Sequence, residues 1–190
     1  MEIGLIICLA IVIFSIFYLV MLYNGLVSLK HSVSKHLANI DVLLKQRHDE
    51  LPKLIETCKQ YMKHEQETLS KVIAARQQVS TAQSNHDMIA LGQAETKLRA
   101  STGQLFALAE NYPDLKADSS FAALQSRISD LENAIADRRE VYNEAVNNNN
   151  VRIEQFPDVI IARWFQFKAF ELLKFAKAEL SDIDVKSLFN

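Results

Sequence analysis

The chain has 190 residues, with 21 basic and 23 acidic side chains and a formal net charge of −2 at pH 7. This length allows one domain with its own core plus a separate anchoring segment. The near balance of charge gives no electrostatic footprint for nucleic acid, and two cysteines cannot form a disulfide framework. Four glycines and three prolines provide little turn material, so the composition predicts long helices.

The first segment, residues 3–23, contains no charged side chain. A bilayer core of about 30 Å needs roughly 20 apolar residues in a helix, and this run has that length. A cleaved signal peptide is the alternative, but it requires a positive n-region and a small-x-small cleavage site. Only Glu2 precedes the run as a charged residue, and residues 21–24 offer no such site. We therefore predict a transmembrane helix over residues 3–23.

The charges that flank this segment predict its orientation. Lys30, Lys35, Lys45 and Arg47 follow the apolar run, and no lysine or arginine precedes it. Because basic residues stay on the cytoplasmic side of a membrane, we expect the N-terminus outside and the remaining chain in the cytoplasm. Membrane lipid is then an expected partner.

The helix is expected to continue beyond the membrane, because Gly25 is the only breaker between Tyr23 and Pro52. Apolar side chains in this stretch recur at heptad-like spacing. They are Val33, Leu37, Ile40 and Leu44. Proline removes a backbone donor and clashes with the preceding turn, so we predict a kink or short break near residues 50–52. The next helix should run to about Gln83.

Turn and capping residues divide the rest of the chain. Ser84-Asn85 precedes a predicted helix that ends near Glu110, and Tyr112-Pro113-Asp114 begins a predicted loop. Candidate N-caps for the following helix are Asp118, Ser119 and Ser120. That helix should reach about Phe156, and the apolar segment 158–177 follows Pro157.

These elements predict an all-α fold. We expect one N-terminal transmembrane helix continuous with a long antiparallel bundle of three or four long helices, followed by a short aromatic helix at the C-terminal end. The predicted organisation is a transmembrane helix over 3–23, a helical bundle domain over 24–180 and a poorly ordered tail over 181–190.

A search for chemistry finds no complete motif. His64-Glu65 begins an HExxH zinc pattern, but the second histidine position holds Thr68. Glu132, Asp137, Arg138 and Arg139 have the spacing of surface ion pairs on a helix, which are far more common than acid–base sites. We expect no catalytic residue, no metal site and no cofactor, and hence a protein that is not an enzyme.

The most informative segment is aromatic. Its candidate contact residues are Trp164, Phe165, Phe167, Phe170 and Phe175. One interpretation is a core helix that closes the end of the bundle. The other is an exposed surface that contacts another subunit or the membrane interface. The run Asn147–Asn150 also has two interpretations, because asparagine is a poor helix former. It predicts either a frayed helix or an inter-helix hydrogen-bond ladder.

Several blocks of the sequence have the pattern of one family. The first is Tyr23-Asn24-Gly25-Leu26-Val27. A second contains Asp41, Leu44, Arg47, Asp49, Pro52, Leu54, Glu56, Thr57, Lys59, Tyr61, His64-Glu65, Leu69, Val72 and Ala75-Arg76. The later blocks are residues 112–117 with Phe121 and Leu124; Glu132-Asn133, Ile135, Arg139, Tyr142-Asn143 and Val146; and Phe156-Pro157 with Ala162. In these residues the chain resembles the LemA family of bacterial membrane proteins, over nearly its whole length. Asn148-Asn149 stands where the family usually has Tyr-Asn, and Gln166 where it often has glycine.

The resemblance implies a helical cytoplasmic domain on one helix in a bacterial inner membrane, and it brings no enzymatic activity. The family includes a magnetosome-membrane protein, which implies membrane shaping or organisation. Our leading hypothesis is a scaffold that forms homo-oligomers through its helical domain. The alternative is a monomeric or small-oligomer adaptor that recruits a protease or envelope-stress partner to the membrane.

Overall fold

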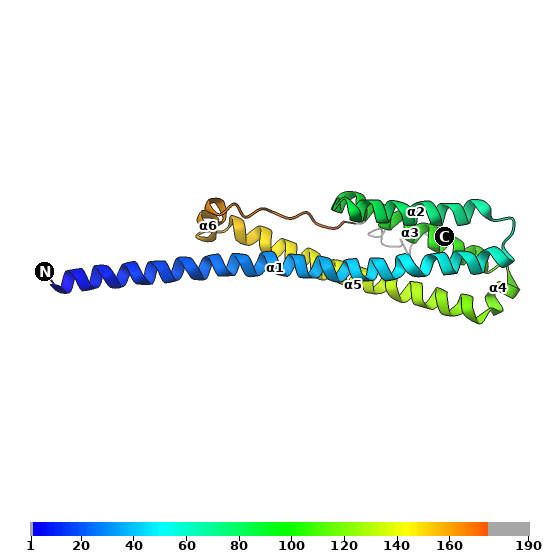
Figure 1. Ribbon diagram of the computed structural model, residues 1–190, viewed down its shortest axis with the longest axis horizontal. Coiled ribbons are helices and arrows are strands. Elements are labelled where there is room, and N and C mark those ends of the chain that lie inside the picture. Colours follow the sequence, from blue (N-terminus) through cyan, green and yellow to red (C-terminus); the bar gives the residue numbers. More distant parts are fainter. Residues whose placement is uncertain (1, 175–190) are drawn as a thin grey trace, which may run out of the picture. The chain divides into compact units, whose positions relative to one another are not determined.

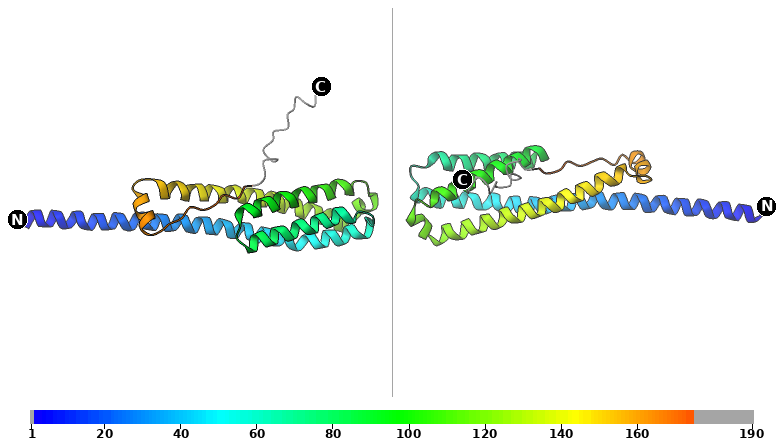
Figure 2. Two further views of the ribbon diagram at one scale, coloured as in Figure 1. Left: turned by 90° about the horizontal axis from the view of Figure 1, so that it is seen from above. Right: turned by 180° about the vertical axis from the view of Figure 1, so that it is seen from behind.

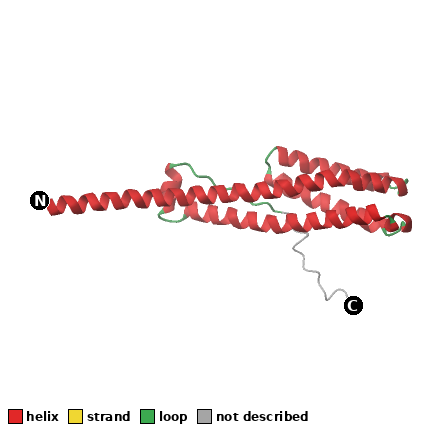
Figure 3. Cartoon of the chain, turned by 60° about the horizontal axis from the view of Figure 1, so that its bottom comes forward, coloured by secondary structure: helices red, strands yellow, loops and turns green. Residues whose placement is uncertain are grey.

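The computed structural model describes residues 2–174, and every regular element in that stretch is a helix (Figures 1 and 3). The helices are α1 (Glu2–Tyr61), α2 (Gln66–Ser84), α3 (Met88–Ala109), α4 (Pro113–Ala117), α5 (Ser119–Glu154) and α6 (Asp158–Trp164). The all-α prediction is confirmed for these residues, and the antiparallel order of the long helices stays a prediction. Phe175 and the expected tail 181–190 lie outside the described residues.

The described residues divide into two compact units. Unit 1 comprises residues 2–38 and 140–171, and unit 2 comprises residues 39–139 and 172–174. Helices α1 and α5 each contribute one part to each unit. The apolar run lies in unit 1, at the N-terminal end of α1.

Helix α1 passes through Pro52 without interruption, so of the kink or short break predicted near residues 50–52 the break is wrong. Proline leaves the carbonyl four residues earlier without its helical donor. That carbonyl belongs to His48, and it accepts a hydrogen bond of 3.0 Å from Nε of Arg76 in α2. Arg76 thus replaces the donor that Pro52 lacks, which explains why the helix tolerates proline at this position.

The first break in the chain comes at residues 62–65 instead, within the stretch predicted to be one helix up to Gln83. Two tyrosine hydrogen bonds connect the residues around this break to the segment between α3 and α5. Tyr61 donates to the carboxylate of Asp118 over 2.9 Å, and Tyr112 donates to Glu65 over 3.1 Å. No glycine or proline marks this break, so tertiary contacts decide its place.

The later boundaries follow local capping chemistry. Asp87 accepts the backbone N–H of Ala90 and caps α3. The side chain of Asp118 accepts the N–H groups of Ser120 and Phe121 over 2.7 and 3.2 Å, as the predicted N-cap of α5 should. The single-turn helix α4 occupies the predicted loop after Tyr112, because proline suits the first position of a helix.

The core of unit 2 is built from apolar side chains that lie on one face of each of its long helices. Helices α2 and α3 lie side by side (Figure 2), and they pack in unit 2 with the C-terminal part of α1 and the N-terminal part of α5. The buried positions include Ile40, Leu44, Leu51, Leu54, Val72, Leu91, Leu98, Leu105, Ile128, Leu131 and Ile135. Burial of one such side chain contributes about 1.5–3 kcal/mol, so these stripes hold the unit together.

Candidate functional site

The candidate site lies in unit 1, where α6 packs on α1 just after the apolar run. Leu22 and Leu26 of α1 form a buried cluster with Ile161 and Ala162 of α6. N-terminal to this cluster, every residue from 2 to 21 is exposed. By its length and composition, α1 is a candidate membrane-crossing helix. The α6 cluster therefore marks where the exposed apolar stretch ends and protein packing begins.

The outer side of α6 stays apolar and uncovered. Trp164 is 79% exposed and Phe165 56%, and in the same region Phe156 is 81% and Ile160 53% exposed. Large aromatic side chains at such exposure indicate a contact surface rather than a core. For Trp164 and Phe165, the interpretation of this segment as an exposed contact surface therefore applies, and the interpretation as a core helix does not.

Tyr23 links this surface to the end of the apolar run. Its ring centroid lies 4.8 Å from that of Phe165 and 5.9 Å from that of Phe167, both within the range of aromatic pairs. Beside these rings is an apolar groove of about 390 Å³. It is lined by Leu19, Val20, Tyr23, Ile160, Ile161, Trp164 and Phe165.

The aromatic segment is helical only as far as Trp164, because α6 ends there in a tight cap. The N–H groups of Gln166 and Phe167 bind the carbonyls of Arg163 and Ala162 over 3.3 and 2.9 Å. This pairing is the Schellman motif, which needs a left-handed residue at its centre. Gln166 occupies that place with φ of 57°. The motif turns the chain, and residues 165–174 continue without regular structure.

The asparagine run of α5 fixes this non-helical segment. Asn150 accepts the N–H of Phe170 and donates to the carbonyl of the same residue, each over 2.9 Å. Asn149 is 1% exposed and donates to the carbonyl of Lys168 over 3.3 Å. Tyr142 donates to the carbonyl of Glu171 over 3.0 Å. The run is thus neither frayed nor a ladder between helices, since the amides of Asn149 and Asn150 bind the backbone of a segment without regular structure.

A second cavity, of about 580 Å³, lies beside the apolar groove and shares Tyr23 and Phe165 with it. Its lining also contains Lys30, His31 and Lys168. None of its ten lining residues has a carboxylate, and neither lysine has an ion-pair partner within residues 2–174. The cavity is therefore cationic, and its wall continues into an apolar surface.

The five aromatic residues predicted from the sequence as contact residues thus differ in their exposure. Trp164 and Phe165 are exposed, Phe167 and Phe170 are half-buried, and Phe175 lies outside the described residues. The sequence already places Lys168 beside these aromatic residues, whereas Lys30 served only to predict the membrane orientation. The signal available in the sequence is lysine close to aromatic residues, which is typical of side chains at a membrane interface.

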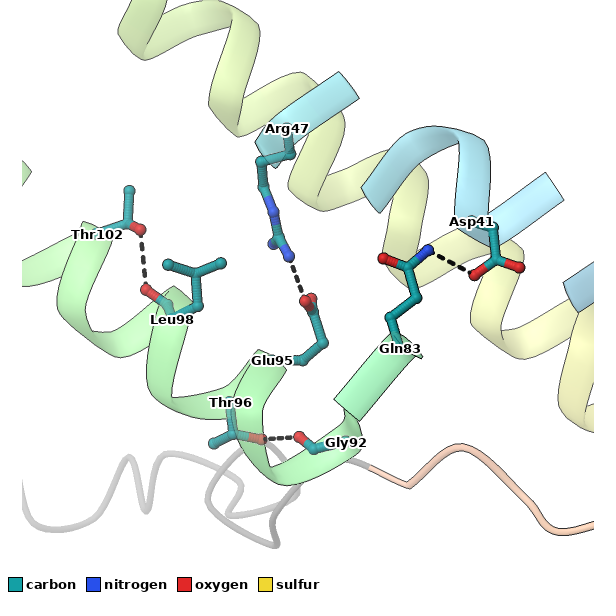
Figure 4. A network of polar contacts seen from close by, with 8 residues as sticks. All are labelled: Asp41, Arg47, Gln83, Gly92, Glu95, Thr96, Leu98 and Thr102. Atoms are coloured by element: carbon teal, nitrogen blue, oxygen red, sulfur yellow. Dashed lines mark hydrogen bonds and ion pairs between the residues drawn. The ribbon is translucent and has the colours of Figure 1, made fainter. Parts of the chain in front are cut away.

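Unit 2 contains a separate polar network in its interior (Figure 4). Arg47 of α1 and Glu95 of α3 form an ion pair and are 2% and 3% exposed. Nearby, Gln83 of α2 donates to Asp41 of α1 over 2.8 Å. Buried ion pairs join elements specifically but gain little net stability after desolvation.

Glu132 of α5 belongs to the same interior. Burial raises the pKa of its carboxyl above the ordinary value, while the charges of Arg47 and Arg99 act in the opposite direction. One of its oxygens is buried and has no hydrogen-bond partner. The prediction of a surface ion pair at Glu132 is therefore wrong, because the residue lies against the core.

A pattern in the sequence could have revealed this network. Arg47 follows Leu44 by three residues and precedes Leu51 by four, so it occupies an apolar-stripe position. Glu95 follows Leu91 by four residues and precedes Leu98 by three, so it too occupies an apolar-stripe position. Opposite charges on the buried stripes of two helices predict a buried pair.

Comparison with known proteins gives a family and two relatives. The family model for LemA matches residues 36–186. Two magnetosome proteins of Paramagnetospirillum magneticum, MamQ 1 and MamQ 2, are each 30% identical to this chain over 87 residues. The match covers 46% of this chain and 32% of each relative, so this chain aligns with about a third of their length.

Proposed function

The chain belongs to the LemA family, and we propose that it is a non-enzymatic scaffold held in the bacterial inner membrane by residues 3–23. In this proposal, copies of the chain associate through their helical domains and organise the membrane around them. The family match and the similarity to two magnetosome proteins support a role at membranes.

One observation carries the proposal. Helix α1 runs without interruption from its exposed apolar stretch, residues 3–21, to Tyr61 in unit 2. A continuous helix satisfies its own backbone polar groups, as the lipid interior requires. The same element would therefore serve as the anchor and as part of the domain.

The basic residues of α1 support the proposed orientation. Lys30, Lys35, Lys45 and Arg47 all follow the apolar stretch, so the helical domain would face the cytoplasm and the N-terminus the outside. A cysteine-reactive, membrane-impermeant reagent tests this on the variant Cys8→Ser/Lys63→Cys, in which the remaining native cysteine, Cys58, is buried. Labelling only after the cells are opened is expected, and labelling of intact cells would reverse the orientation.

Self-association is tested by the mass of the full chain after extraction in mild detergent. We expect particles of several chains at micromolar concentration, and electron microscopy should show one repeated assembly. A single chain per particle across the concentration range would contradict the scaffold.

The adaptor is the alternative that this measurement separates. A monomeric chain that is recovered from membranes with one other protein, in a fixed ratio, would favour recruitment of a protease or an envelope-stress partner. Recovery of the chain only with copies of itself would favour the scaffold.

A further inference from the structure

We propose that unit 1 binds an anionic phospholipid, with its phosphate between Lys30 and Lys168 and an acyl chain in the groove between α1 and α6. This site goes beyond the scaffold proposal and does not depend on self-association. In this proposal the exposed aromatic surface contacts one kind of ligand, a lipid of the leaflet in which the apolar run ends.

Charge is the first argument. The cavity of about 580 Å³ is lined by Lys30, His31 and Lys168 and by no carboxylate. Both lysines are exposed and without an ion-pair partner among residues 2–174, so neither charge is compensated within unit 1. Two ammonium groups at one cavity match the charge of a lipid phosphate.

The wall of the cavity is the second argument. Tyr23 and Phe165 line both the cationic cavity and the apolar groove of about 390 Å³, which are therefore neighbours. A free phosphate ion would bind in the cationic cavity but has no apolar part to fill the groove. A phospholipid has both chemistries in one molecule, with a charged headgroup followed directly by an acyl chain.

Depth in the membrane is the third argument. Lys30 lies seven residues after Tyr23, about 10 Å along the helix at 1.5 Å per residue. Helical side chains tilt toward the N-terminus, and lysine extends its ammonium toward the interface. Its charge then lies a few ångströms beyond the hydrocarbon, in the headgroup layer that surrounds a core of about 30 Å.

The loop that supplies Lys168 is held in place by α5. Asn149 binds the carbonyl of Lys168, and Asn150 binds both backbone groups of Phe170. These contacts fix the backbone of the second lysine relative to α5 before any ligand arrives. Less conformational entropy is lost when such a preorganised site binds.

The experiment uses Trp164, which is the only tryptophan of the chain and lines the groove. The full chain is reconstituted in phosphatidylcholine vesicles that contain a small, equal fraction of either brominated phosphatidylglycerol or brominated phosphatidylcholine. Bromine on the acyl chains quenches tryptophan fluorescence at contact. We expect stronger quenching by the anionic lipid, with an apparent preference of at least about fivefold, the effect of one lysine near an anionic lipid.

The double variant Lys30→Gln/Lys168→Gln should bring this preference close to one, while quenching itself persists. The matched control is Lys59→Gln/Lys63→Gln, which removes the same charge from unit 2 and should leave the preference unchanged. Millimolar inorganic phosphate should not abolish the preference, because the groove selects a lipid.

Three results would overturn the proposal. Equal quenching by the two lipids would show no headgroup selection, and an unchanged preference in the Lys30/Lys168 variant would remove the cationic cavity from it. Absence of quenching by both lipids would show that something other than lipid, such as a second copy of the chain, covers Trp164. Self-association measured on the same preparation distinguishes each result from failure of the scaffold.

Discussion

At the scale of single residues, unit 2 depends on charges placed inside an apolar interior. The pair Arg47–Glu95 joins α1 to α3, and each residue lies on a helix face whose other buried positions are mostly leucine. Such a pair selects the partner and register of a helix, because any other pairing leaves a buried charge uncompensated. We infer that its role is specificity of packing.

Removing one partner should therefore cost much more than removing both. Arg47→Ala or Glu95→Ala should each lower the free energy of unfolding by about 3–5 kcal/mol, since an unpaired charge stays buried. The double variant Arg47→Met/Glu95→Met should recover most of that loss. Urea unfolding followed by circular dichroism measures this.

The control is the exposed pair Lys45–Asp49 at 2.7 Å. Lys45→Ala should change the free energy of unfolding by less than about 1 kcal/mol. If the two single variants at Arg47 and Glu95 changed stability as little as this control, the pair would not matter for packing.

Glu132 gives a prediction in pH. Its pKa is raised in the folded state, chiefly by burial, so folding favours the protonated form. Stability should therefore fall as pH rises from about 4.3, the unfolded value for glutamate, through the folded pKa. Above that range the loss is constant.

Glu132→Gln should remove this contribution, so the variant should gain stability over the wild type as pH rises through the window. The difference between the two unfolding curves isolates Glu132, because other groups titrate in both proteins. At Glu67, the hydrogen bond from Lys71 lowers the carboxyl pKa, so Glu67→Gln should give a small difference of the opposite sign. Parallel curves for wild type and Glu132→Gln would contradict the assignment.

At the scale of elements, two glycines of α3 have opposite surroundings. A Cβ on Gly92 would collide with the carbonyl of Lys174, whereas a Cβ on Gly103 would meet nothing within 4 Å. Gly92 thus lets the chain around the buried Leu173 lie against α3.

Gly92→Ala should displace residues 172–174 and lower the stability of unit 2, by up to about 1.5–3 kcal/mol if Leu173 is exposed. Gly103→Ala should instead raise stability by about 0.5–1 kcal/mol through helix propensity. Urea midpoints of the two variants provide the comparison. Stabilisation by both substitutions would show that the 172–174 contact is unimportant.

The cap of α6 offers a second test at this scale. Gln166 has φ of 57°, a left-handed conformation that costs a non-glycine residue roughly 1 kcal/mol. Gln166→Gly should therefore increase the hydrogen-exchange protection of the Phe167 amide several-fold. Gln93→Gly, in the interior of α3, should reduce protection around it, since glycine weakens helices. Unchanged or reduced protection at Phe167 would show that the left-handed conformation of Gln166 does not destabilise the cap.

The sequence predicts much of this architecture through local rules. Apolar periodicity located buried positions of α1 at Val33, Ile40 and Leu44, and Asp118, one of three candidate caps, does cap α5. The uninterrupted passage through Pro52 could not be predicted, because it depends on Arg76, which is remote in the sequence. The break at residues 62–65 likewise lacks a local signal.

The candidate site was only partly predictable for the same reason. Aromatic density identified Trp164 and Phe165, but nothing local shows that Asn150 binds the backbone of Phe170 twenty residues later. The cationic cavity needs Lys30 and Lys168 to line one space, and these residues are 138 positions apart in the sequence.

At the scale of the whole molecule, one chain of the LemA family contains both an apolar helix end and a packed helical domain. The scaffold, the cytoplasmic orientation and the lipid site all require residues 3–23 to stay in lipid with the rest of the chain attached. A protein cut after this segment would have neither an anchor nor the groove residues Leu19 and Val20.

This requirement is tested most directly by the intact mass of the protein in each fraction after an alkaline carbonate wash of isolated membranes. We predict that the chain stays with the membranes and that its mass includes residues 3–23. A chain shortened near Asn24 and released into the wash would contradict the account.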